Sequence, residues 1–187
     1  LLIDNSSSMR ESKMTETLRT AIFWMRVLDI FEVPFSIKLF GSSVVSVKDF
    51  DEPIGLPQSR VKRKLMALAD ASMFHTDIGS PLFQARDEMM AKRRKYKDSL
   101  GAIFVLSDSG ANYGVTGKAL ADEVGVIAQR YALTNFILSS SEAEVREAFD
   151  IFGERNVVAP RDFTQLCPES IRVLRGTLDS FRRKCRL

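Results

Sequence analysis

The sequence is poor in the residues that hold soft metals and disulfide frameworks. It has two cysteines, Cys167 and Cys185, and one histidine, His75, among 187 residues. The two cysteines are far apart and lack the short pairwise spacing of zinc sites. We therefore interpret them as reduced thiols of an intracellular protein, because disulfides are rare in that compartment.

Signatures of several enzyme and membrane classes are also missing. No apolar run approaches the roughly 20 residues of a membrane span, and the opening LLI is too short for a signal peptide. The chain has neither a P-loop nor a G-x-S-x-G elbow. A phosphatase of the haloacid dehalogenase type would have a second acid where Ser6 stands, and a serine hydrolase would need a base. We predict that the domain itself is not an enzyme.

Length and composition fit one globular domain over residues 1–187. The hydrophobic fraction is 45%, the charged fraction 27% and the net charge +3. Only three apolar residues precede Asp4, although a central strand usually has about five or six. We therefore expect this domain to be a fragment of a chain that extends upstream of Leu1.

Basic residues gather in three clusters, RVKRK at 60–64, KRRK at 92–95 and RRK at 182–184. Such clusters usually lie on the solvated face of a helix, and we interpret them in this way. A basic surface for nucleic acid is the alternative interpretation, of another functional class.

Strand and helix patterns alternate along the chain. Strands are predicted over residues 1–4, 35–40, 44–50, 100–106, 133–138 and 156–159. Helices are predicted over residues 14–32, 58–71, 78–97, 118–132, 142–152 and 168–184. Pro34 is expected to end the first helix, and Gly41-Ser42 to form a hairpin turn. This order predicts a doubly wound α/β sheet, mostly parallel, with helices on both faces and one antiparallel edge strand.

Oxygen-bearing side chains follow three of these segments, in loops at the expected carboxyl edge of the sheet. The loops are DNSSS at 4–8, FHTD at 74–77 and SDSG at 107–110. Hydroxyls and carboxylates suit magnesium, calcium or manganese. In the first loop, alternate residues can point to one site while Asn5 and Ser7 point elsewhere. The simpler alternative is that Asp4 and the serines only cap a helix. We interpret Asp77 as a structural residue that starts the next helix, and His75 as a rim or packing residue.

The pattern Asp4-x-Ser6-x-Ser8, followed by Thr76 and Asp108, resembles the metal-ion-dependent adhesion site (MIDAS) of von Willebrand factor A (vWA) domains. The order of elements is similar over essentially the whole chain. The resemblance implies the vWA fold and metal-dependent binding of a protein partner. A vWA-like domain that keeps the fold but binds no ion is the simpler alternative within this family.

The resemblance also implies how each residue would act. Ser6, Ser8 and Thr76 would contact a divalent cation directly, and Asp4 and Asp108 would act mostly through water. The cation would be Mg²⁺, or Mn²⁺ or Ca²⁺, and a partner's Asp or Glu would complete its coordination. We expect Thr76 and Asp108 to be exposed loop residues that contribute little to stability.

Within the family, residues 4–53 resemble the midasin-type intracellular vWA domains. The similarity rests on DNSSSM and on FEVPFSIKLFGSSVVSVKDFDEP at 31–53, whereas HTDIGSPL at 75–82 is similar to the general family form. The resemblance implies association with an AAA-type ATPase and a role in ribosome assembly, with a nuclear location. A vWA subunit of a MoxR-type or metal-chelatase complex in the cytoplasm is the alternative. No membrane partner is expected.

Overall fold

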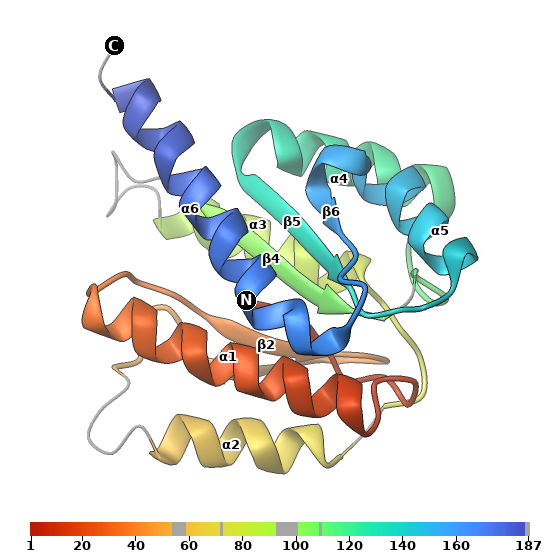
Figure 1. The fold of residues 1–187 in the computed structure, drawn as a ribbon, viewed down its shortest axis with the longest axis horizontal. Helices are drawn as coiled ribbons and strands as arrows, with labels where there is room; N and C mark the ends of the chain where they lie inside the picture. Colours follow the sequence, from red (N-terminus) through yellow and green to blue (C-terminus); the bar gives the residue numbers. More distant parts are fainter. Residues whose placement is uncertain (54–58, 72, 93–100, 109, 186–187) are drawn as a thin grey trace.

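A six-stranded sheet forms the centre of the computed structural model, which describes residues 1–53, 59–71, 73–92, 101–108 and 110–185 (Figure 1). The strand order is β3-β2-β1-β4-β5-β6, and only the β2–β3 pair is antiparallel. The strands are β1 (Leu2–Asp4), β2 (Ile37–Phe40), β3 (Val44–Lys48), β4 (Ala102–Ser107), β5 (Ala132–Ile137) and β6 (Val157–Val158). The predicted fold class is therefore confirmed, including the antiparallel edge strand after Gly41.

Helices cover both faces of this sheet (Figure 1). They are α1 (Ser12–Ile30), α2 (Ser59–Ala69), α3 (Gly79–Lys92), α4 (Gly117–Arg130), α5 (Glu142–Phe152) and α6 (Leu166–Cys185). Short 3₁₀ turns, η1 (Glu154–Asn156) and η2 (Phe163–Gln165), flank β6. One core cluster joins α3, α4 and α5 to the sheet, and the other joins α1, α2 and the start of α6 to the opposite face.

The short strand β1 contributes to both cores. Leu2 belongs to the cluster under α3, α4 and α5, whereas Ile3 belongs to the cluster under α1 and α2. Successive side chains of a strand point to opposite faces, so an uninterrupted apolar run suits a strand covered on both sides. Asp4 follows these two residues as the last residue of β1, so it lies at the carboxyl edge of the sheet.

Most helix boundaries lie one or two residues from the predicted ones, and two of these differences have a clear physical cause. α1 ends at Ile30, because Glu32 takes a left-handed φ of 53° and Val33 donates its N–H to the Leu28 carbonyl at 2.8 Å. This Schellman-type end closes the helix before Pro34 is reached. Ala132, predicted to be helical, instead pairs with Ala102 as the first residue of β5.

The basic cluster at 60–64 lies on α2, where its four charged residues are exposed and Val61 is buried. This agrees with a solvated helix face. Residues 93–95 of the second cluster lie outside the described residues, and 182–184 belong to α6. Within the part of the chain that the structure describes, no helix has the length and apolar character required to cross a bilayer.

Candidate metal centre

The two strands that carry the predicted acids are neighbours. β1 pairs in parallel with β4, so that Ile3 lies opposite Leu106. From β1 the chain continues to β2 on one side, and it later returns to β4 on the other side. The carboxyl ends of two such strands border the crevice where α/β sheets bind ligands. Asp4 and Asp108 therefore lie at the position where this fold places a site.

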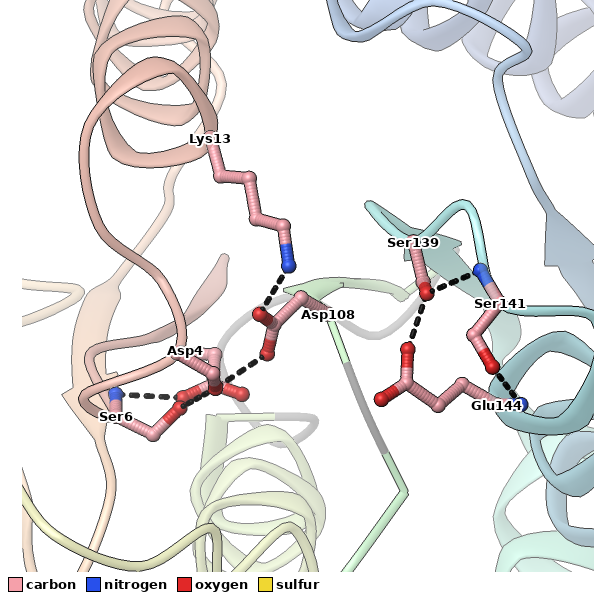
Figure 2. Close-up of polar contacts among 8 residues, drawn as sticks. Asp4, Ser6, Lys13, Asp108, Ser139, Ser141 and Glu144 are labelled. Atoms are coloured by element: carbon pink, nitrogen blue, oxygen red, sulfur yellow. Dashed lines mark hydrogen bonds and ion pairs between the residues drawn. The ribbon is translucent and has the colours of Figure 1, made fainter.

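A chain of hydrogen bonds connects four of the five predicted residues (Figure 2). The Ser6 N–H donates to Asp4 Oδ1 at 2.8 Å, and the Ser6 and Ser8 hydroxyls are 3.0 Å apart. The Ser8 hydroxyl donates to Asp108 Oδ1 at 2.8 Å. Residues about one hundred positions apart in the sequence thus bring their oxygens together.

Thr76 is held at the same edge of the sheet by contacts of its own segment with two others. Met73 donates its N–H to the Asn5 carbonyl at 2.8 Å and forms a parallel bridge with Ser6. Thr76 donates its N–H to Asn112 Oδ1 at 2.8 Å, and Asn112 returns a bond to the Thr76 carbonyl at 3.1 Å. The segment that carries Thr76 is therefore joined to the first loop through Met73 and to the segment after the third loop through Asn112.

Burial of the site is greater than predicted. Asp4, Thr76 and Asp108 are at most 1% exposed, and of the site residues only Ser8 is exposed. The expectation that Thr76 and Asp108 are exposed residues is wrong. Their small contribution to stability stays a prediction. These residues are engaged in contacts between segments distant in the chain, such as Ser8 with Asp108 and Thr76 with Asn112, which sequence patterns do not reveal.

Asp4 has a strongly shifted pKa. Burial raises the pKa of its carboxyl to about 7, against hydrogen bonds from Ser6 that lower it. The negative charge of Asp108 raises this pKa further. Asp4 Oδ2 is buried and has no hydrogen-bond partner among the described residues. A cation beside this oxygen would satisfy it and would favour the ionised carboxylate.

Lys13 is a site residue that the sequence analysis did not identify. Its ammonium donates to Asp108 Oδ2 at 2.6 Å, from the first turn of α1 (Figure 2). The one signal available in the sequence was a lysine near a helix start, where positive charge is unfavourable. Such a position is informative only once a carboxylate is known to lie beside it.

Three neighbouring residues support the loops. Asn5 points away from the site, as predicted, and donates from Nδ2 to the Leu68 and Ala71 carbonyls at 2.9 and 3.1 Å. Asp77 accepts bonds from the N–H and hydroxyl of Ser80, at 3.1 and 2.6 Å, and so starts α3 as predicted. His75, at the rim, stacks on Tyr113 with ring centres 5.5 Å apart.

The donor set fits a hard divalent cation. It consists of hydroxyl and carboxylate oxygens, and one buried carboxylate oxygen lacks a partner. Within the described ranges, no three His, Cys, Asp or Glu side chains gather as a metal-binding group. Neutral hydroxyls must therefore supply a large part of any coordination, which is unsuited to soft ions.

Comparison with solved structures agrees with this fold. Proximal thread matrix protein 1 from the mussel byssus, solved with a zinc-occupied MIDAS motif, has a TM-score of 0.62 and 14% identity, with 92% of this chain and 45% of that chain covered. The manganese-loaded TRAP protein of Plasmodium vivax has a TM-score of 0.64 and 12% identity, with 89% and 68% covered. Both neighbours are vWA-domain proteins.

The chain accordingly has the vWA fold. It spans less than half the length of the mussel protein. No model of a known protein family matches the sequence, and no curated protein matches it either. At such low identity the likeness establishes the fold alone.

Proposed function

We propose that this domain is a metal-dependent protein-binding module. A divalent cation would be held by Ser6, Ser8 and Thr76 directly and by Asp4 and Asp108 mostly through water. The observation that carries the proposal is the hydrogen-bonded chain from Asp4 to Asp108, with a buried Asp4 oxygen beside it that lacks a partner. With neutral hydroxyls as ligands the cation stays electrophilic, so a partner's Asp or Glu would complete its coordination.

The finer assignments are part of the same proposal. Mg²⁺ is the ion that we propose for an intracellular setting, because it accepts hydroxyl, carboxylate and water oxygens. An AAA-type ATPase is the proposed associated machine, in a midasin-like role in ribosome assembly. This part is supported only by the resemblance of residues 4–53 to that group. The domain itself would contribute binding and no catalysis.

Titration calorimetry with Mn²⁺ tests the metal site. We expect weak binding by the isolated domain, because hydroxyls dominate the inner coordination shell and the partner's carboxylate is missing. The double variant Ser6→Ala/Ser8→Ala should give no heat of binding. Ser7→Ala, in the same loop, is the matched control and should bind as the parent does. Equal binding by the parent and the double variant would rule out this site.

Dependence on chelator tests the mode of partner binding. Capture of a candidate partner should disappear with chelator and decrease only modestly with salt, because a nearly buried contact is poorly screened. A nucleic-acid surface would instead ignore chelator and lose affinity steeply with salt, with a log–log slope of about −0.9 per phosphate contact on duplex DNA. Chelator-resistant binding that is lost when Arg60 and Lys62 are neutralised would favour that other function.

A further inference from the structure

Lys13 and Asp108 form an ion pair at the site. The ammonium lies 2.6 Å from Asp108 Oδ2, whereas Asp108 Oδ1 accepts the Ser8 hydroxyl. The Asp108 side chain is 1% exposed and the Lys13 side chain 24%. A buried carboxylate therefore meets a positive charge that belongs to the protein itself, and it does so through the oxygen that the serine leaves free.

Local preferences oppose this position of Lys13. The lysine lies in the first turn of α1, which contains no acidic residue. The partial positive charge of a helix N-terminus disfavours a cation there. Glu11, which precedes the helix, has φ 56° and ψ −119°, a conformation that non-glycine residues rarely adopt. The contact with Asp108 is thus the favourable interaction that Lys13 gains at this place.

The Glu11 turn is firmly held despite its conformation. Its carbonyl accepts the Thr15 N–H at 3.0 Å and the Thr15 hydroxyl at 2.9 Å. The start of α1 is therefore fixed next to the loop of Ser6 and Ser8. This arrangement keeps the ammonium within reach of Asp108, while the partial exposure of the lysine leaves room for it to turn toward solvent.

We propose that Lys13 sets the affinity of the site for divalent cations by competing with the cation for Asp108. This inference rests on the proposed function. A divalent ion near Asp4 and Asp108 would lie within a few ångströms of the Lys13 ammonium. Repulsion between two cations at that distance is substantial even with strong screening. Once displaced, the same ammonium would stand at the rim and attract the partner's carboxylate.

The test compares Mn²⁺ binding by the parent, Lys13→Met, Lys13→Gln and Lys62→Met. Both Lys13 variants should bind Mn²⁺ about tenfold or more tightly than the parent, because a competing positive charge has been removed. Lys62→Met removes the same charge from the exposed side of α2 and should bind as the parent does. Calorimetry at constant ionic strength measures the affinities.

The melting temperature, measured with and without Mn²⁺, distinguishes this role of Lys13 from a purely structural one. In chelator the Lys13 variants should melt below the parent, because the buried Asp108 carboxylate loses its partner. With Mn²⁺ they should show the larger rise in melting temperature. Unchanged or weaker Mn²⁺ binding by both folded Lys13 variants would overturn the inference while leaving the metal site intact. If the parent and all variants bind no Mn²⁺, the proposed function and this inference fail together.

Discussion

Asp4→Asn should give a domain that is more stable in the absence of divalent cations and that no longer binds them. The asparagine keeps an oxygen for the Ser6 N–H, which donates to Asp4 Oδ1 at 2.8 Å in the parent. The substitution removes the buried Asp4 carboxyl, whose pKa burial raises to about 7. We expect the free energy of unfolding in chelator at pH 8 to increase by about 1–3 kcal/mol.

The pH dependence of this gain follows from the direction of the pKa shift. The folded protein holds the Asp4 proton up to about pH 7, whereas the unfolded chain releases it near its ordinary value of 3.8. Asp4 therefore costs the parent no stability below about pH 4, and its cost grows as the pH rises to about 7. Urea denaturation should show the difference between parent and variant at pH 8 and little difference at pH 4.5. A variant that is destabilised at both values would mean that the carboxylate has a structural role.

The second large effect has the opposite sign and concerns the adjacent residue. Asn5→Ala should lower the free energy of unfolding by about 2 kcal/mol or more. The Asn5 amide donates to the Leu68 and Ala71 carbonyls, and its backbone joins Phe40 to Met73. Removing the side chain leaves the carboxyl end of α2 without these bonds and creates a cavity beside β1.

Urea denaturation at neutral pH in chelator measures this loss. Ser7→Ala is the control, because Ser7 is half-buried in the same loop and should change stability by only about 0.5 kcal/mol or less. If Asn5→Ala unfolded at the same urea concentration as Ser7→Ala, Asn5 would not hold α2 to the site loop.

The patterns of apolar residues predicted most of the architecture. Leu2 and Ile3 before Asp4, and Ile103, Val105 and Leu106 before Ser107, are buried and divide between the two core clusters on opposite faces of the sheet. The apolar run that produces this burial is local in the sequence. The end of α1 was missed because Glu32 adopts a left-handed conformation that nothing in its residue type indicates. Helix ends depend on such single dihedral angles, whereas helix existence depends on many residues together.

For the site, the sequence identified four residues that the structure joins by hydrogen bonds, Asp4, Ser6, Ser8 and Asp108, but not what surrounds them. The spacing of Asp4, Ser6 and Ser8 reports the geometry of one loop. The pairing of Lys13 with Asp108 and the burial of Thr76 arise from contacts between segments distant in the chain, such as that of Thr76 with Asn112. These contacts depend on the packing of loops, and loop packing leaves no periodic pattern of residue types in a single sequence.

The only tryptophan of the chain gives the domain an internal optical probe. Trp24 is 4% exposed on α1, its indole N–H donates to the Ser170 hydroxyl of α6 at 3.0 Å, and its ring stacks on Phe104 of β4 at 5.6 Å. Its emission therefore reports the environment where one sheet strand and two helices meet. Detachment of α6 would therefore change the emission of Trp24 directly. Lys13 lies in the first turn of the same helix α1, so an event at the cation site would change this emission only if the whole helix moved.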